Sequence, residues 1–160
     1  MEVLYNMKKI LPVLLIMILL LSGCKSAEKN SLDKSDWNFS RIIEIQTGVV
    51  VFSNEKNSAK YNTAKVIDLS FTADESKITI KDSATGNEWV LDYAENKTAK
   101  TNNTEGTIYD ITYTSEEKTI KGYATTGIAN LSDVSKYTYI VITLGGYELH
   151  FNDMTETKIA

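Results

Sequence analysis

The strongest constraint on the fold is an alternation of apolar and polar residues in short runs that begins at Arg41. Successive side chains of a strand point to opposite faces, so this alternation is the period-two signature of half-buried β-strands. The runs are rich in β-branched and aromatic residues, which strands favour. The pattern predicts strands at about Arg41–Phe52, Ala64–Thr72, Lys77–Asp82, Glu88–Tyr93, Thr107–Thr114, Lys118–Thr125, Tyr137–Leu144 and Tyr147–Asn152.

Turn residues between these runs predict the register of three hairpins. Gly145-Gly146 is typical of a two-residue hairpin turn, and longer turns stand at residues 83–86 and 115–118. Closing each hairpin there puts its large apolar residues on one face, and a one-residue slip would spoil that agreement. The predicted pairs are Leu144 with Tyr147, Ile142 with Leu149, Ile140 with Phe151, Ile80 with Trp89, Ile78 with Leu91, Tyr113 with Ile120, Ile111 with Gly122 and Tyr109 with Ala124.

Consecutive hairpins predict an all-β fold, an antiparallel up-and-down meander of about eight strands. Closing this meander into a small barrel removes its exposed edges. An eight-stranded barrel either fills its interior with side chains or holds one small ligand. Two segments lack the strand pattern, Tyr93–Glu105 and Thr126–Lys136. The first is expected to form a polar loop, and the second to contain one helical turn at Leu131–Val134.

The chain begins with a different kind of segment. Lys8 and Lys9 precede the apolar run Ile10–Leu21, and Ser22, Gly23 and Cys24 follow it. The run is well short of the about 20 apolar residues that cross a bilayer as a helix. It instead has the layout of a secretory signal peptide, for which either Met1 or Met7 can serve as the start.

The stretch Leu21-Ser22-Gly23-Cys24 resembles the lipobox of bacterial lipoproteins. The resemblance implies that residues 1–23 are a signal peptide and that Cys24 carries a diacylglyceryl group. Two acyl chains on one residue anchor a protein stably. The expected location is therefore the outer, extracytoplasmic face of the cell membrane. Residues 24–36 are then the lipidated cysteine and a flexible polar tether, and residues 37–160 one barrel domain.

Charge and composition argue against a nucleic-acid partner and against disulfide bonds. The full chain carries a net charge of −4. Removing residues 1–23 takes away Glu2, Lys8 and Lys9, a net of +1, and leaves −5. An acidic chain with a single arginine, Arg41, is a poor nucleic-acid binder. With its only cysteine lipidated, the chain forms no disulfide, and we expect a monomer without a cofactor.

The residues capable of chemistry are few. His150 is the only histidine, and the predicted register puts it on the polar face opposite Val141, as an ordinary surface residue. The carboxylate pairs Asp74-Glu75 and Glu116-Glu117 stand at predicted turns, where neighbouring side chains point apart and do not converge on a metal. The sequence therefore predicts no metal site and a protein that is not an enzyme.

The aromatic residues are more informative. Trp89, Tyr109 and Tyr113, with Ile111, are the candidate ligand-lining residues of the barrel interior, because aromatic rings give a pocket apolar area and a polar handle. The alternative is that they are ordinary core residues. Tyr137 and Tyr139 fall on the outer face of their strand and are candidate contacts for a partner.

Several segments together resemble the small lipocalin-like lipoproteins of Gram-positive bacteria: Trp37 before the first strand, Trp89–Tyr93, Gly122–Thr126 and the closing hairpin Gly145–Phe151. The resemblance implies a slim eight-stranded barrel that binds a small apolar or amphipathic ligand. An alternative is an immunity or interaction lipoprotein that intercepts a cationic antimicrobial peptide or a protein partner at the membrane surface. The negative charge of the mature chain would steer such a peptide toward it.

Overall fold

A computed structural model describes residue 32 and residues 37–99, 106–132 and 135–158. The predicted signal peptide, Cys24 and all of the predicted tether except Leu32 lie outside the described residues. Within the described ranges, no helix has the length and apolar character needed to cross a bilayer.

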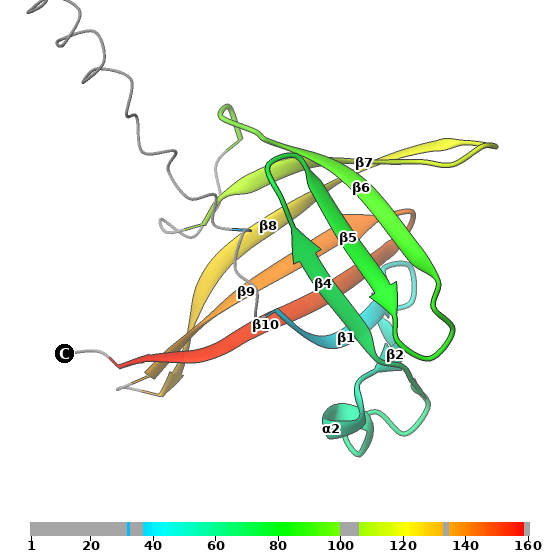
Figure 1. Cartoon of the computed structure of the whole chain (residues 1–160). Helices are drawn as coiled ribbons and strands as arrows, with labels where there is room; N and C mark the ends of the chain where they lie inside the picture. Colours follow the sequence, from blue (N-terminus) through cyan, green and yellow to red (C-terminus); the bar gives the residue numbers. More distant parts are fainter. Residues whose placement is uncertain (1–31, 33–36, 100–105, 133–134, 159–160) are drawn as a thin grey trace, which may run out of the picture. The chain divides into compact units, whose positions relative to one another are not determined.

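The described residues form one sheet of ten strands and one short helix (Figure 1). The elements are β1 (Asn38–Glu44), β2 (Val49–Ser53), α2 (Glu55–Ser58), β3 (Lys65–Val66), β4 (Leu69–Ala73), β5 (Lys77–Asp82), β6 (Glu88–Glu95), β7 (Ile108–Thr114), β8 (Thr119–Ser132), β9 (Ser135–Leu144) and β10 (Tyr147–Lys158).

The sheet closes into the predicted antiparallel barrel. Strands β4 to β10 pair in chain order, and β1 joins the two ends of this meander by pairing with both β4 and β10. The ring therefore has eight strands, while β2 and β3 form an extension on the β4 side of β1. The prediction of a small all-β barrel is confirmed.

The structure also confirms the register of all three predicted hairpins. Each pair predicted from the turns is a cross-strand pair in the structure. The turn between β9 and β10 has Gly145 at φ 60° and Gly146 at φ 90°. Two successive positive φ angles match the twist of the flanking strands and suit glycine, which lacks a Cβ.

Two predicted strands are each divided in two. The run Arg41–Phe52 contains β1 and β2, joined by a turn in which Gly48 takes φ 69°. The run Ala64–Thr72 contains β3 and β4, which pair with different strands. Between them the Ile67 amide donates to the Ser53 carbonyl, and the Asp68 carbonyl accepts from Ser83. Alternation alone does not reveal where a strand changes partner.

The two segments predicted to lie outside strands are partly strands. The Tyr93–Glu105 segment begins as the end of β6, through Glu95. Leu131 and Ser132 continue β8, so the prediction of a helical turn there is wrong. Pairing with β9 along its length explains why β8 runs past the short run visible in the sequence.

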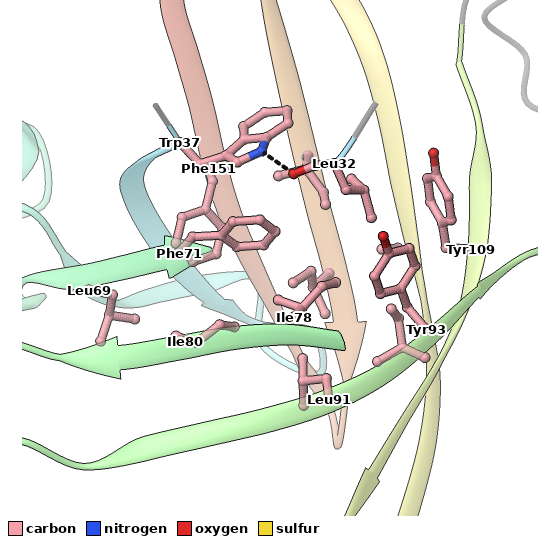
Figure 2. Close-up of a cluster of buried hydrophobic side chains, with 14 of the residues drawn as sticks. Leu32, Trp37, Leu69, Phe71, Ile78, Ile80, Leu91, Tyr93, Tyr109 and Phe151 are labelled. Carbon is pink, nitrogen blue, oxygen red and sulfur yellow. Dashed lines mark hydrogen bonds between the residues drawn. The ribbon is translucent and has the colours of Figure 1, made fainter. Parts of the chain in front are cut away.

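The interior of the barrel is filled with side chains. Phe39, Phe71 and Phe151 pack in edge-on and tilted contacts with ring centroids 5.1–5.7 Å apart, and Trp37 packs on Phe71 at 5.9 Å. Residues that present almost no surface to solvent leave no room beside them for a water-sized molecule. The buried apolar residues are Leu32, Trp37, Phe39, Leu69, Phe71, Ile78, Ile80, Leu91, Tyr93, Tyr109, Ile111, Ala124, Ile140, Ile142 and Phe151. Figure 2 labels several of them, among them Trp37, Phe71 and Phe151.

Leu32 belongs to this core although the sequence puts it in the polar tether. Its side chain is fully buried, and its carbonyl accepts a hydrogen bond of 3.3 Å from the Trp37 indole Nε1 (Figure 2). An apolar side chain in a polar segment gains roughly 1.5–3 kcal/mol by full burial. The ordered domain therefore includes Leu32, five residues before Trp37.

Candidate functional site

A hollow of about 240 Å³ opens on the outer face of the barrel. Four neighbouring strands, β1, β10, β9 and β8, contribute to it. The lining residues are Ser40, Arg41, Ala129, Tyr137, Tyr139, Val141, His150 and Asn152. We call this the outer hollow.

The strand register brings these residues together. Arg41 lies opposite His150, which lies opposite Val141 on the next strand. Asn152 lies opposite Tyr139 in the adjacent row. Side chains of directly opposite residues share a face, so two rows of outward-facing side chains run side by side across the sheet. Their neighbours Ile140, Ile142 and Phe151 point inward and are fully buried.

A β-bulge at Ser40 aims Arg41 at this face. Phe39 pairs with Phe151 and Arg41 with His150, so Ser40 is an extra residue without a partner on β10. A bulge breaks the alternation and re-aims the side chains that follow it. Phe39 and Ile42 therefore both belong to the core, although three positions separate them.

The segment that contains α2 holds the bulge in place. The Asn54 side-chain oxygen caps α2 by accepting from the Asn57 backbone amide at 2.9 Å. The Asn54 side-chain nitrogen donates to the Phe39 carbonyl. The Asn57 side chain donates to the Ser40 hydroxyl at 3.3 Å. Further along, the Tyr61 hydroxyl accepts from Arg41 Nη1 at 3.2 Å. These bonds orient the guanidinium.

The ring of Tyr139 lies over Gly127, its partner on β8. A Cβ at position 127 would stand 2.5 Å from the Tyr139 hydroxyl and 2.6 Å from Cζ. Only glycine leaves this space, because any other residue would displace the ring. Gly127 thus sets the position of one wall of the outer hollow.

His150 is less exposed than the sequence suggests. Its side chain is 17% exposed, and its Nε2 lies 3.2 Å from Glu148 Oε2. Burial lowers the pKa of His150 below its ordinary value of 6.5, and the positive charge of Arg41 lowers it further. The Glu148 carboxylate opposes this shift without cancelling it. At neutral pH the imidazole is therefore uncharged.

Arg41 is a half-buried cation without an acidic partner in the part of the chain that the structure describes. The Tyr61 phenol is its side-chain hydrogen-bond partner, and the nearby Glu148 is bonded to His150 instead. Sequence analysis did not single out Arg41 as a site residue. The three-residue separation of Phe39 and Ile42 was the available signal, because two core-facing residues at that spacing require a bulge between them.

The other predicted site residues are distributed differently. Tyr137 and Tyr139, the predicted partner contacts, both line the outer hollow. Tyr109 and Ile111 are 2% and 1% exposed and are enclosed by the core. Tyr113 is half-buried at the edge of the core. Trp89 is 37% exposed, on the inner face near the start of β6.

The acidic turn residues make local hydrogen bonds. Asp74 accepts from the amides of Ser76 and Lys77, and these bonds lower its pKa below 3.8. Among the described residues, no three His, Cys, Asp or Glu side chains are grouped so that they could hold a metal ion. The two bonds to Asp74 hold the turn between β4 and β5.

Comparison with protein-family models, with curated proteins and with solved structures gave no match to this chain.

Proposed function

We propose that this protein is an extracytoplasmic lipoprotein, anchored by Cys24, that binds a peptide or protein partner through the outer hollow and is not an enzyme. The observation that carries the proposal is the contrast between a filled interior and a hollow on the outer face lined by two tyrosines and the single arginine. Tyrosine and arginine are enriched among the residues that dominate binding energy at protein interfaces.

The size of the outer hollow supports a macromolecular partner. Pockets for small organic ligands usually measure roughly 300–1,000 Å³ and enclose most of the ligand. The outer hollow measures about 240 Å³ and opens to solvent. It suits one or two anchoring side chains of a partner whose remaining contacts lie on the surrounding sheet.

The charge of the chain favours a basic partner. The mature chain carries a net −5, since removal of residues 1–23 takes a net of +1 from −4. Such a charge accelerates encounter with cationic molecules at low salt. A cationic antimicrobial peptide that approaches the bilayer is the partner class that fits this steering and the expected membrane location.

The test combines cell survival with direct binding. Deleting the gene should increase sensitivity to at least one peptide of a cationic antimicrobial panel, and restoring the wild-type chain should reverse this. A deletion strain that expresses the Cys24→Ala variant, which lacks the anchor, should have most of this protein outside the membrane fraction. It should also be protected less well against the peptide than a strain that expresses the wild type. Unchanged sensitivity after deletion, together with no calorimetric binding of any panel peptide, would exclude the proposal.

A second candidate rests on the exposed ring of Trp89. Trp89 lies on the inner face of the barrel, as Ile80 opposite it does, near the end that carries the β5–β6 turn. Half-buried Tyr113 and Leu144 also face inward. This end would admit an apolar ligand at the barrel mouth. Lipid extracts or apolar dyes should then raise the melting temperature and shift tryptophan fluorescence, and Trp89→Ala should abolish both effects.

A further inference from the structure

We infer that the outer hollow recognises a carboxylate side chain of a protein or peptide partner, and that Arg41 is the residue that binds it. The inference rests on the proposed function only in that a partner occupies this hollow. It names the group that the hollow selects, which the net charge of the chain does not reveal.

The first argument is the missing counter-charge. A half-buried guanidinium is costly unless an anion compensates it. The described residues give Arg41 one phenol as a side-chain partner and no ion pair. In a chain with 21 acidic residues, a cation in a concave surface without an internal carboxylate is left available for an external one.

The second argument is that the carboxylate of Glu148, on the neighbouring strand β10, does not pair with Arg41. Glu148 is bonded to His150 at 3.2 Å. The positive charge of Arg41 lowers the pKa of His150. An incoming carboxylate therefore meets one full positive charge on Arg41, an uncharged imidazole at neutral pH, and a Glu148 carboxylate that hydrogen-bonds to His150 rather than to Arg41.

The third argument is the fixed geometry of the donor. The Tyr61 hydroxyl accepts from Nη1 of Arg41, and the Ser40 bulge fixes the backbone that carries it. The remaining N–H groups of the guanidinium form a planar fork that fits both oxygens of a carboxylate. Because the fork is held in advance, less conformational entropy is lost on binding.

The fourth argument is the apolar surroundings. Tyr137, Tyr139, Val141 and Ala129 give the outer hollow ring faces and methyl groups beside Arg41. A glutamate side chain has methylene groups that these surfaces can cover and a carboxylate that reaches the guanidinium. A volume of about 240 Å³ accommodates such a side chain and part of a neighbouring residue.

The charges of the chain then act at two ranges. The net negative charge attracts a basic partner over a distance, and Arg41 selects an acidic residue on that partner at contact. A purely basic peptide would be attracted and would lack the anchoring group. A partner must therefore be basic overall to be attracted and carry an acidic residue to be held, and this double requirement makes binding selective.

The sequence supplies a direct spectroscopic readout. The chain contains one arginine and one histidine, so the Arg41 Nε–Hε signal and the two C–H signals of the His150 ring need no assignment by mutation. The full chain in detergent micelles is titrated with acetyl-Ala-Glu-Ala-amide. The matched control is acetyl-Ala-Gln-Ala-amide, which differs only in the carboxylate.

The glutamate peptide should shift the Arg41 signal saturably, and the glutamine peptide should bind about tenfold or more weakly, as expected for the loss of a charged hydrogen bond. Arg41→Gln should lose binding of the glutamate peptide, and Arg41→Lys should retain part of it. Lys121→Gln removes one positive charge from an exposed position outside the hollow and should bind like the wild type.

The inference is overturned if the wild-type Arg41 signal stays unmoved at the highest peptide concentration, or if both peptides shift it equally. These outcomes need no variant, so misfolding of Arg41→Gln does not obscure them. They are also distinct from failure of the proposed function. Selective binding of the glutamate peptide with unchanged antimicrobial sensitivity after gene deletion would support the carboxylate site and exclude the peptide-interception role.

Discussion

The two faces of β9 and β10 are built from alternating residues of the same strands, yet they differ in burial and in the polarity of their side chains. On the inner face, Ile140, Ile142 and Phe151 are fully buried among other apolar side chains. On the outer face, Tyr139 and His150 are half-buried and line an open hollow. One face supplies apolar burial to the barrel, and the other carries the proposed binding surface. Changes one position apart should therefore have separable effects.

The largest expected effect is the loss of an inner-face aromatic ring. Phe151→Ala should lower the free energy of unfolding by about 3–5 kcal/mol, because it removes ring contacts with Phe39 and Phe71 and leaves a cavity. Urea denaturation followed by tryptophan fluorescence measures the change. The matched variant Asn152→Ala alters the neighbouring outer-face residue and should cost less than about 1 kcal/mol. Equal costs would contradict the division between the faces.

A similar effect is expected at Leu32. Leu32→Ala should cost about 2–5 kcal/mol, because the side chain is fully buried although the surrounding sequence is polar. Val90→Ala is the control, since Val90 is 40% exposed and should change stability far less. If Leu32→Ala proves as mild as the control, then the core does not extend into the predicted tether. Thermal denaturation of both variants measures the difference.

A smaller effect should appear on the outer face, and it should be reversible by a second mutation. Gly127→Ala places a methyl group against the Tyr139 ring and should destabilise by about 1–2 kcal/mol. In Gly127→Ala/Tyr139→Ala the clash is absent, so the double-mutant cycle should show a coupling of about 1 kcal/mol. Gly122→Ala is the contrasting case. Its methyl group meets the Thr143 carbonyl of the backbone, which no side-chain truncation relieves.

The smallest expected effect is a pH dependence from His150. Its folded pKa lies below 6.5, so the unfolded chain binds the proton first as the pH falls. Stability should be unaffected by His150 well above pH 6.5, decline as the pH falls from there to the lowered folded pKa, and then level off. The slope cannot exceed that of one proton, about 1.4 kcal/mol per pH unit.

His150→Gln should remove this slope, as measured by urea denaturation from pH 7 downward. Asp74 and Asp82 provide the internal control, since their pKa values are lowered from 3.8 and their contribution falls in a separate, more acidic range. The same decline in His150→Gln and in the wild type, over the range from pH 6.5 down to the lowered folded pKa of His150, would contradict the assigned cause.

The sequence was sufficient for the barrel because alternation and turn chemistry are local. Gly145-Gly146 alone gave the pairing of Ile140 with Phe151. The outer hollow was harder to predict, since it depends on which strands meet after the barrel closes. Nothing near Arg41 in sequence indicates that His150 lies opposite it. For Trp89 the strand register was predicted correctly and the burial was not. Its position near the end of a strand leaves the ring partly exposed.

The pairing of β1 with β10 has a consequence for the order of events during folding. The hairpins from β4 to β10 join segments close in sequence, whereas this seam joins the first strand to the last. Loop-closure entropy makes such long-range pairing late and slow. Arg41 comes from one side of the seam and His150 from the other. The outer hollow therefore exists only after β10 has been synthesised and has docked on β1, so the proposed binding surface is a property of the closed barrel alone.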